Sequence, residues 1–445
     1  MSKRTRKKMP SGEFAAVIES LNHEGRGVTH LQGKATFLFN ALPAESVLFR
    51  YTHCHRQLDE GITTQIINAS PDRVTPRCQH FGVCGGCALQ QLSPEKQRAH
   101  KQKILLEHLK HQAQCEPVLI EDPLHTDPWG YRRRARLSAR FVTKKNKVLL
   151  GFRERESHFV TDVQQCETLH PAMGLKISTL GALLSTLSIR SEIPQIEIAI
   201  GDTEKAMVVR HMVAIPNEDQ EKLVEFATEN QWQLYFQPGD QTSIHAIFPS
   251  TPAELFYDLP AQSIRMYFKP LQFTQINADV NRLMITRAID WLQLQKEDRV
   301  LDLFCGIGNF SLPIARFVSH VIGIEGSLSS IVQAKENALR NQINHADFDT
   351  HDLTKPLPQT LWASSRFDKI LLDPPRAGAA EIIESMHHWK PRRIVYISCN
   401  PITLARDAKT LLQLGYTLEK TCIVDMFPHT DHIEAMALFT HEHVS

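Results

Sequence analysis

Long apolar runs are missing from this sequence. No segment approaches the roughly 20 consecutive apolar residues that a helix needs to cross a bilayer, and no apolar segment follows the N-terminal cations as it would in a secretory signal. The chain also lacks a charge excess, because 50 Lys and Arg residues are balanced by 49 Asp and Glu residues. We therefore expect a cytoplasmic protein without membrane segments, and the net charge alone indicates no polyanionic partner.

Disulfide bonds are not expected either. Nine cysteines in a cytoplasmic chain of 445 residues do not predict a disulfide framework, so the spacing of several of them needs another explanation. The length predicts about three domains.

Positive charge is concentrated in two segments. Residues 1–10 form a basic arm whose cations can hold phosphates. Its cations are Lys3, Arg4, Arg6, Lys7 and Lys8. Residues 131–155 contain ten basic residues and a single acidic one, Glu154, with aromatic residues among them. Basic groups neutralise phosphates and aromatic rings stack on unpaired bases, so this stripe favours nucleic-acid binding, although a solvated pair of surface strands would have the same composition.

The secondary-structure pattern divides the chain into three parts after the basic arm. Residues 11–70 contain short strand-like runs separated by turns, which predict a small barrel of the oligonucleotide-binding type, or alternatively a cap domain of a metabolic enzyme. Residues 71–268 begin with a Pro-, Gly- and Cys-rich connector, include a predicted helix over 97–112, and continue as a mainly β middle domain. From 269 to 445 strands and helices alternate, which predicts a doubly wound parallel sheet and an α/β fold.

A glycine-containing turn follows the strand-like run 299–304. Gly306 and Gly308 let a ligand approach the backbone, but Ser311 replaces the third glycine of a pyrophosphate-binding fingerprint. Glu325 ends the next predicted strand, 19 residues after Gly306, where its carboxylate can accept hydrogen bonds from ribose hydroxyls. An adenosine without a pyrophosphate fits this pattern better than NAD, and S-adenosylmethionine (SAM) is such a ligand.

Two further strand ends carry reactive side chains. Asp373 precedes two prolines and Arg376, whereas enzymes that methylate exocyclic amines have an aromatic residue in place of this arginine. Cys399 directly follows another predicted strand. Because ligands bind at the carboxyl ends of parallel strands, Gly306, Glu325, Asp373 and Cys399 are predicted to meet at one crevice.

A cysteine in this position predicts covalent catalysis, although a buried, inert thiol is the alternative. Carbon 5 of uracil is too weak a nucleophile to attack a methyl sulfonium unaided. A thiolate that adds to carbon 6 converts the ring to an enolate, whose carbon 5 can accept the methyl group. A base must then remove the carbon 5 proton so that the thiol can be eliminated. Cys399 is therefore the predicted nucleophile.

The candidates for this base lie near the C-terminus. If the segments 417–427 and 433–439 form a hairpin at the sheet edge, their turn returns to the edge that carries Cys399, and Glu434 faces the crevice. Composition alone does not choose among the turn residues. The candidates are His429, Asp431, His432 and Glu434.

A second group of cysteines has the spacing of a metal site. Cys78, Cys84 and Cys87 are separated by five and two residues, and Cys166 could complete four thiolates. Structural zinc sites usually pair two Cys-x₂-Cys knuckles, whereas plant-type iron–sulfur proteins use Cys-x₄-Cys-x₂-Cys plus a distant cysteine. The spacing favours an iron–sulfur cluster over zinc, and unliganded thiols are a third interpretation. A cluster here would be structural or would bind substrate.

Several longer motifs resemble one family. They are residues 70–74 before Cys78, 131–136, 273–277, 398–401 and 425–430 before Glu434. Together with the features above, they make nearly the whole chain similar to the RumA-type family of 23S ribosomal RNA uracil-5-methyltransferases, also called RlmD. The barrel and the cysteine motif together distinguish this subfamily from related uridine methylases that act on transfer RNA.

The resemblance implies domain boundaries, catalytic residues and ligand-binding residues for this chain. It implies a TRAM barrel over 11–70, a central iron–sulfur domain over 71–268, and a Rossmann-like SAM-dependent methyltransferase domain over 269–445, on which residues 93–124 would pack. It implies that Cys399 is the nucleophile and Glu434 the base. The implied ligands of a [4Fe–4S] cluster are Cys78, Cys84, Cys87 and Cys166. The implied SAM contacts are Gln275, Phe304, Asn309, Glu325, Asp352 and Asp373.

The resulting hypothesis is a monomeric enzyme that methylates carbon 5 of a uridine in 23S ribosomal RNA through a covalent cysteine adduct. Methylation of transfer RNA or of another ribosomal uridine is one alternative. A non-catalytic RNA-binding assembly factor is the other, and Cys399 distinguishes it, because such a factor would not need the nucleophile.

Overall fold

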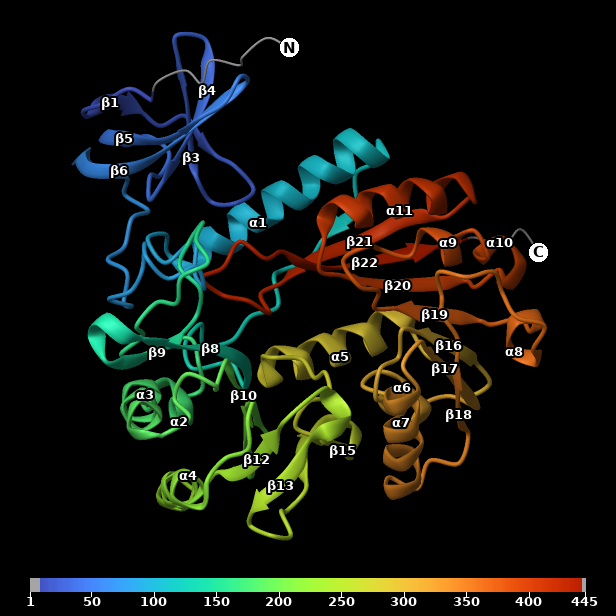
Figure 1. Cartoon of the computed structure of the whole chain (residues 1–445). Helices are drawn as coiled ribbons and strands as arrows, with labels where there is room; N and C mark the ends of the chain where they lie inside the picture. The colour runs from blue at the N-terminus through green and yellow to red at the C-terminus, as the bar shows by residue number, and fades with distance from the viewer. Residues whose placement is uncertain (1–8, 442–445) are drawn as a thin grey trace, which may run out of the picture. The chain divides into compact units, whose positions relative to one another are not determined.

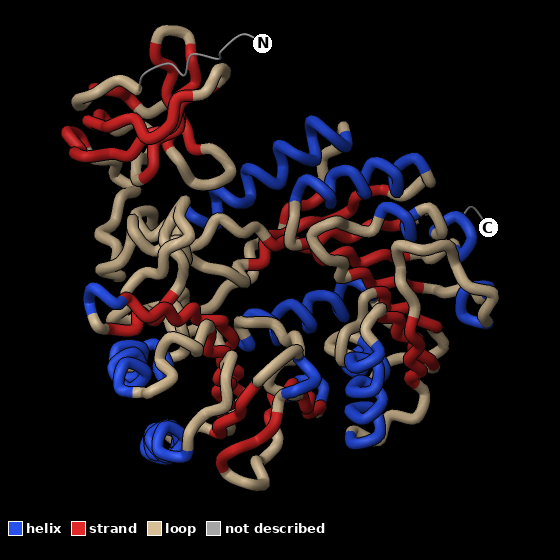
Figure 2. Tube along the Cα trace, in the orientation of Figure 1, coloured by secondary structure: helices blue, strands red, loops and turns tan. Residues whose placement is uncertain are grey.

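The structure is a computed structural model that describes residues 9–441, so the cations between Lys3 and Lys8 lie outside the described residues. The chain forms two compact units (Figures 1 and 2). Of the described residues, the first contains 9–101, 152–161 and 428–431, and the second contains 102–151, 162–427 and 432–441. Among the described helices, none is long and apolar enough to cross a membrane.

The first unit is built around a six-stranded mixed sheet in the order β1-β5-β6-β4-β3-β2. β4 pairs in parallel with β6, and the other pairings are antiparallel. A small apolar core with Ile18, Leu38, Val47 and Phe49 fills it. The strands are β1 (Phe14–Val17), β2 (Ser20–Leu21), β3 (Gly27–Leu31), β4 (Lys34–Phe39), β5 (Ser46–Cys54) and β6 (Leu58–Asn68).

The helix predicted over 97–112 is confirmed, with a start three residues earlier. It is α1 (Pro94–His108), followed by a π-helical turn, Leu109–Ala113. Pro94 occupies the first helical position, where its missing N–H leaves no unsatisfied donor, and the Gln97 amide then donates to the Ser93 carbonyl at 2.9 Å.

A six-stranded mixed sheet with helices forms the middle of the chain. Its order is β13-β12-β11-β10-β8-β9, and it lies in the second unit. Its strands are β8 (Arg134–Val142), β9 (Lys147–Gly151), β10 (Gln195–Ile200), β11 (Lys205–Arg210), β12 (Gln233–Gln237) and β13 (His245–Phe248). Its helices are α2 (Pro171–Gly174), α3 (Ile177–Thr186) and α4 (Asn217–Glu229). A two-stranded ribbon follows, formed by β14 (Leu255–Leu259) and β15 (Ile264–Phe268).

The alternation of strands and helices predicted after residue 269 is confirmed. An eight-stranded sheet has the order β18-β17-β16-β19-β20-β22-β21-β7. The first five strands in this order are parallel, β22 is antiparallel to both β20 and β21, and β7 joins the edge parallel to β21. The strands are β7 (Leu119–Ile120), β16 (Arg299–Leu303), β17 (His320–Glu325), β18 (Ala346–Thr350), β19 (Lys369–Leu372), β20 (Arg393–Ser398), β21 (Thr417–Val424) and β22 (Glu434–Thr440).

Helices cover both faces of this sheet (Figure 1), and apolar side chains alternate between the two faces. Leu371 of β19 belongs to the cluster beneath α5, α6 and α7, whereas its neighbours Ile370 and Leu372 belong to the cluster beneath α9, α10 and α11. Burial on both faces explains why β19 reads as a continuous apolar run. The helices are α5 (Ala278–Leu292), α6 (Ser311–Ala315), α7 (Leu328–Arg340), α8 (Leu361–Ser364), α9 (Ala380–Ile383), α10 (Met386–Trp389) and α11 (Pro401–Gln413).

The strand order reverses between β16 and β19. From β16 the chain proceeds to β17 and β18 on one side, and then crosses to β19 and β20 on the other. A crevice forms at the carboxyl ends of the strands where the winding direction changes, and ligands of open α/β sheets bind there. The Gly306 turn follows β16 and Asp373 follows β19, so both lie at this point.

The burial of Asp302 predicts that the stability of the protein depends on pH. It is fully buried in β16 and accepts a hydrogen bond from the Ser311 hydroxyl at 2.5 Å. Burial raises the pKa of Asp302 to about 7, and the charges of Asp373 and Glu325 act in the same direction. Between its ordinary pKa of about 4 and this value, the folded chain holds a proton that the unfolded chain loses, so the free energy of unfolding falls as pH rises through this window.

Asp302→Asn removes this titration. From pH 5 to pH 8 the wild type should lose roughly 2–3 kcal/mol of its free energy of unfolding through Asp302, because one pKa unit corresponds to about 1.4 kcal/mol. The variant should not show this loss. Urea denaturation at both pH values measures the difference. Asp349→Asn, an exposed change on β18, serves as the control, and parallel pH profiles for Asp302→Asn and the wild type would contradict the interpretation.

Candidate active site

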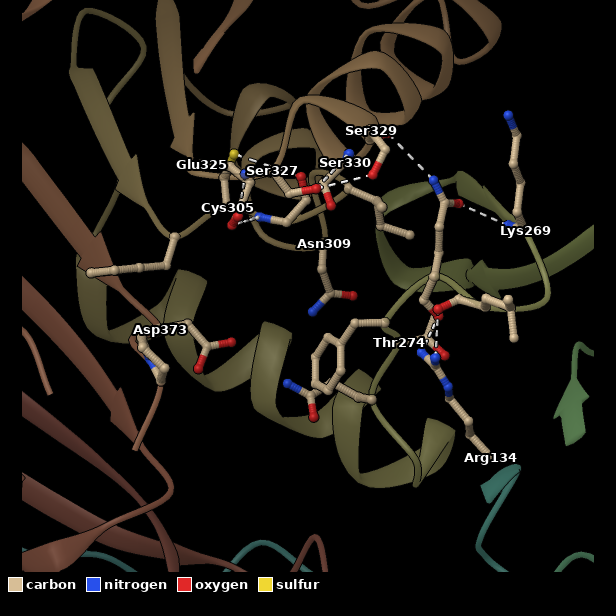
Figure 3. Close-up of a pocket in the computed structure, with 18 of the residues that line it drawn as sticks. Arg134, Lys269, Thr274, Cys305, Asn309, Glu325, Ser327, Ser329, Ser330 and Asp373 are labelled. Atoms are coloured by element: carbon tan, nitrogen blue, oxygen red, sulfur yellow. Dashed lines mark hydrogen bonds between the residues drawn. The ribbon is translucent and has the colours of Figure 1, made fainter. Parts of the chain in front are cut away.

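A cavity of about 1340 Å³ opens at the carboxyl ends of the parallel strands in the second unit (Figure 3). The four predicted strand-end positions, Gly306, Glu325, Asp373 and Cys399, all line it. The cavity is mainly apolar on its walls, with a small number of polar groups aimed inward, as is usual for a small-molecule site. The convergence predicted from the sequence is therefore present in the structure.

The turn after β16 has an unusual backbone. Gly306 and Gly308 have φ angles of +56° and +90°, and a Cβ on Gly306 would meet no atom within 4 Å. Phe304 also has a positive φ, +65°, which is costly for a side chain of this size. Its N–H and that of Cys305 donate to the Ile324 carbonyl at 2.8 and 3.1 Å. These two bonds fix the strained turn against β17, with Phe304 in the cavity wall.

Glu325 is oriented by backbone donors from two segments. One carboxylate oxygen accepts from the Gly306 N–H at 3.3 Å, and the other accepts from the Ser327 N–H at 2.9 Å. Ser327 is drawn beside Glu325 in Figure 3. A carboxylate oxygen can accept more than one hydrogen bond, so Glu325 retains acceptor capacity for two hydroxyls of a ligand.

Asn309 projects into the cavity from the end of the same turn (Figure 3). Its side-chain oxygen accepts from the Tyr257 hydroxyl at 2.8 Å and from the Asn281 amide at 3.0 Å. Its own amide donates to the Asn281 oxygen at 3.0 Å. Sequence reasoning did not identify Tyr257 or Asn281, because neither belongs to a motif and both reach Asn309 only through the fold.

Arg134 shapes another part of the cavity wall. Its guanidinium donates to the carbonyls of Leu271, at 2.6 Å, and Gln272 (Figure 3). The segment 269–275 between β15 and α5 thus curves around an arginine, and it brings Phe273 and Gln275 to the cavity. The sequence analysis treated Arg134 as part of a basic stripe, whereas the structure gives it backbone partners.

Cys399 lies between the end of β20 and the start of α11. Asn400 caps that helix through its side-chain oxygen, which accepts from the Ile402 N–H at 3.1 Å, and its amide donates to the Arg376 carbonyl at 3.0 Å. The cap therefore fixes Cys399 beside the segment that carries Asp373.

The surroundings of Cys399 favour its protonated form. Burial raises the pKa of the Cys399 thiol to about 11, and the nearby carboxylates of Glu434 and Asp373 act in the same direction, while Arg376 opposes them. Burial also raises the pKa of Asp373, to about 7. At neutral pH Cys399 is thus mainly a thiol, and formation of its thiolate requires a change in its electrostatic surroundings.

The register of the last strands brings Glu434 close to Cys399. β22 is antiparallel to β20, and Ala435 pairs with Ser398. Continuing this register by one residue places Glu434 opposite Cys399. Glu434 is buried, with 4% of its surface exposed, and lines the cavity. The predicted hairpin and the predicted orientation of Glu434 are confirmed.

The other base candidates separate into two groups. His432 lines the cavity, where the Arg376 guanidinium lies 2.9 Å from its Nδ1. His429 and Asp431 belong to the first unit and do not line it. Within that unit the His429 carbonyl accepts from the N–H groups of Ala88 and Leu89 at 2.9 and 3.0 Å.

Five of the six implied SAM contacts line the cavity. They are Gln275, Phe304, Asn309, Glu325 and Asp373. Asp352 does not line it. This side chain is exposed, and its carboxylate accepts hydrogen bonds from the N–H and the hydroxyl of Thr354 at 3.0 and 2.7 Å, as in an Asx turn.

The four cysteines of the predicted cluster are divided between the units. Cys78, Cys84 and Cys87 lie in the turn-rich connector of the first unit, and Cys166 lies in the second. The Cys78 N–H donates to the Gln90 side chain at 3.1 Å, and the Gly86 N–H donates to the Cys84 sulfur at 3.4 Å.

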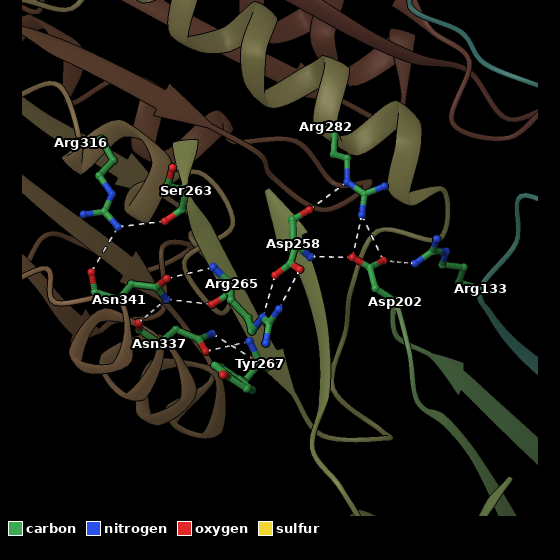
Figure 4. Close-up of polar contacts among 10 residues, drawn as sticks. All are labelled: Arg133, Asp202, Asp258, Ser263, Arg265, Tyr267, Arg282, Arg316, Asn337 and Asn341. Carbon is green, nitrogen blue, oxygen red and sulfur yellow. Dashed lines mark hydrogen bonds and ion pairs between the residues drawn. The ribbon is translucent and has the colours of Figure 1, made fainter. Parts of the chain in front are cut away.

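The basic stripe is largely occupied by contacts within the protein. Arg133 pairs with Asp202 (Figure 4), and Tyr131 is buried, so its ring is not available for a base. Two further cations of the stripe have carboxylate partners. These pairs are Arg136–Glu197 and Lys147–Asp162. Four cations are exposed and have no ion pair among the residues that the structure describes. They are Arg140, Lys144, Lys145 and Arg153.

Comparisons with known proteins agree with this geometry. The family model for tRNA (uracil-5-)-methyltransferase matches residues 257–442. The 23S rRNA (uracil(1939)-C(5))-methyltransferase RlmD of Alcanivorax borkumensis is 43% identical over 437 residues, covering 98% of each chain. The protein of the same name from Methylococcus capsulatus is 44% identical over 435 residues, again with 98% coverage of each.

One solved structure has a similar fold over nearly the whole chain. It is the Pyrococcus abyssi tRNA (uracil-54, C5)-methyltransferase in complex with S-adenosyl-L-homocysteine. The TM-score is 0.72 at 23% identity, with 96% of this chain and 100% of the other covered.

The pKa of Cys399 predicts a steep pH dependence of its alkylation. The rate of its reaction with iodoacetamide should rise about tenfold per pH unit from pH 7 to pH 10 without a plateau, because the thiolate fraction grows over this range. Glu434→Gln removes one of the charges that raise the pKa, so the rate at pH 8 should increase severalfold. Mass spectrometry of the Cys399 peptide measures both rates.

Glu419→Gln provides the control, because Glu419 lies on β21 but does not line the cavity. It should leave the profile unchanged. A plateau in the wild-type rate by pH 9 would show that the cavity does not raise the pKa as described.

Proposed function

The chain belongs to the RlmD family of 23S rRNA (uracil-C5)-methyltransferases, and we propose that it transfers a methyl group from SAM to carbon 5 of a uridine in 23S ribosomal RNA. The observation that carries this proposal is the pairing of Cys399 with Glu434 across β20 and β22, inside a cavity that also holds a glycine-rich turn and Glu325. A nucleophile and a base on the same edge match the chemistry that carbon 5 methylation requires.

The protein groups act in a defined order. The Cys399 thiolate adds to carbon 6 of the uracil, and the electron pair of the carbon 5–carbon 6 double bond moves to make carbon 5 nucleophilic. SAM, when bound, supplies an electrophilic methyl group. After carbon 5 has been methylated, Glu434 removes its proton, the double bond forms again, and the sulfur–carbon 6 bond breaks to release the thiolate.

Binding of the RNA has to activate the thiol. Arg376 is the cation that opposes the carboxylates around Cys399, and it lies in the cavity wall. Burial holds Asp373 near its protonation midpoint at neutral pH, so a proton on Asp373 would remove one of the charges that keep Cys399 protonated. Protonation of Asp373 therefore lowers the pKa of the thiol without a change in the fold.

We propose that the cofactor is held by Gln275, Phe304, Asn309, Glu325, Asp352 and Asp373. Five of these residues line the cavity, and Glu325 retains acceptor capacity for ribose hydroxyls. Asp352 follows β18, the strand next to β17, and would need to turn from its contact with Thr354 to take part.

We further propose a [4Fe–4S] cluster on Cys78, Cys84, Cys87 and Cys166. Their spacing supports it, and so does the Gly86 N–H that donates to the Cys84 sulfur, because such hydrogen bonds stabilise thiolate ligands of clusters. The six-stranded sheet of residues 11–70 would then be an OB-like TRAM barrel for RNA, and 71–268 an iron–sulfur domain. Residues 269–445 would be a Rossmann-like methyltransferase domain. We propose that the enzyme works as a cytoplasmic monomer.

Loss of the gene should remove one 5-methyluridine from 23S ribosomal RNA, which mass spectrometric mapping of total RNA would detect. The wild-type gene should restore the modification, and Cys399→Ala should not, because the covalent step is lost. Loss of 5-methyluridine from transfer RNA instead would favour the substrate of the Pyrococcus abyssi relative. Restoration by Cys399→Ala would indicate a role as an assembly factor.

RNA that contains 5-fluorouridine should trap the enzyme covalently. Fluorine at carbon 5 cannot leave as a proton, so the reaction stops after methyl transfer with the sulfur–carbon 6 bond intact. Denaturing gel electrophoresis detects the adduct, which should need both SAM and Cys399. Cys422→Ser, a change at a buried cysteine on β21 outside the cavity, serves as the control. Absence of a wild-type adduct would refute the proposed mechanism.

A further inference from the structure

The hydrogen bonds of Asn309 leave one N–H of its side-chain amide to face the cavity. Its oxygen has two acceptor positions, and both are occupied, by the Tyr257 hydroxyl and the Asn281 amide. Its amide has two N–H groups, and one donates to Asn281. A single N–H therefore remains to face a ligand. Burial raises the pKa of Tyr257 well above its ordinary value, so its hydroxyl stays protonated and keeps donating.

An ion-pair network fixes the two partners of Asn309 (Figure 4). Arg282, the residue after Asn281, donates to the carbonyl of Asp258, the residue after Tyr257, at 2.9 Å. Arg282 also binds both carboxylate oxygens of Asp202, at 3.1 and 2.9 Å. Asp202 in turn accepts from the Asp258 N–H at 2.8 Å. The network thus locks β14 to α5 at the positions adjacent to Tyr257 and Asn281.

We propose that Tyr257 and Asn281 are positioning residues that hold the Asn309 amide as a pure hydrogen-bond donor, and that this donor recognises the carboxylate at the amino-acid end of SAM. This inference rests on the proposed function. The two ends of SAM differ in chemistry: ribose hydroxyls are donors and suit the carboxylate of Glu325, whereas the amino-acid carboxylate is an acceptor and suits a fixed N–H. An Asn309 amide that could flip would present its oxygen to that carboxylate and repel it.

Two ligands separate this role from a general loss of structure. S-adenosylhomocysteine carries the amino-acid end, and 5′-methylthioadenosine lacks it. Tyr257→Phe removes one hydroxyl and retains the ring, so it should weaken binding of S-adenosylhomocysteine about fivefold to tenfold, as expected for one lost hydrogen bond, and change binding of methylthioadenosine less than about twofold. Isothermal titration calorimetry of the full-length protein measures both affinities. In steady-state assays the KM for SAM should rise while kcat stays near the wild-type value.

Asn281→Asp provides an independent variant, because a carboxylate there cannot donate to the Asn309 oxygen, while the aromatic packing of Tyr257 is untouched. It should show the same selective loss. Tyr235→Phe is the matched control, since the Tyr235 hydroxyl donates to Gln233 at 3.1 Å and does not line the cavity. It should leave both affinities unchanged.

The outcomes distinguish the inference from the proposed function. If the wild type binds both ligands and the Tyr257 and Asn281 variants weaken both equally, or neither, the positioning role is refuted and the proposed function stands. If the wild type binds neither ligand, the proposed cofactor itself is wrong.

Discussion

The antiparallel pairing of β22 with β20 is the constraint on which the site depends. Gly306, Glu325, Asp373 and Cys399 follow or end parallel strands of this sheet, and parallel strands present only their carboxyl ends at this edge. β22 runs the other way, so it presents its first residue there, and Glu434 meets Cys399. The opposing directions of two neighbouring strands thus place Glu434 next to Cys399, although more than 30 residues separate them in sequence.

The cofactor side of the cavity depends on segments that lie before the parallel sheet. Tyr257 comes from the β14–β15 ribbon and Arg134 from β8, and each contacts a cavity-lining segment of the domain that follows. The ion pairs of Asp202 with Arg133 and Arg282 connect these segments to α5. The middle of the chain is thereby part of the framework that holds the cavity-lining residues.

The sequence predicted the parts of this arrangement that depend on chain direction and local chemistry. The alternation of strands and helices, the strand-end positions of Gly306, Glu325, Asp373 and Cys399, and the final hairpin followed from periodicity and turn residues. Tyr257, Asn281 and the carbonyl partners of Arg134 could not be predicted, because these contacts join residues that no local pattern relates. Ion pairs could not be predicted for a similar reason: charge composition counts arginines but does not show that Arg133 and Arg136 pair with Asp202 and Glu197.

The raised pKa of Cys399 has a consequence for the resting enzyme. Oxidation by peroxide and alkylation by metabolic electrophiles both proceed through the thiolate. Burial and two carboxylates keep the Cys399 thiol protonated, so it reacts slowly with both kinds of reagent while the site is empty. The Glu434 carboxylate, which we propose as the base, thus also helps to keep the Cys399 thiol protonated between turnovers.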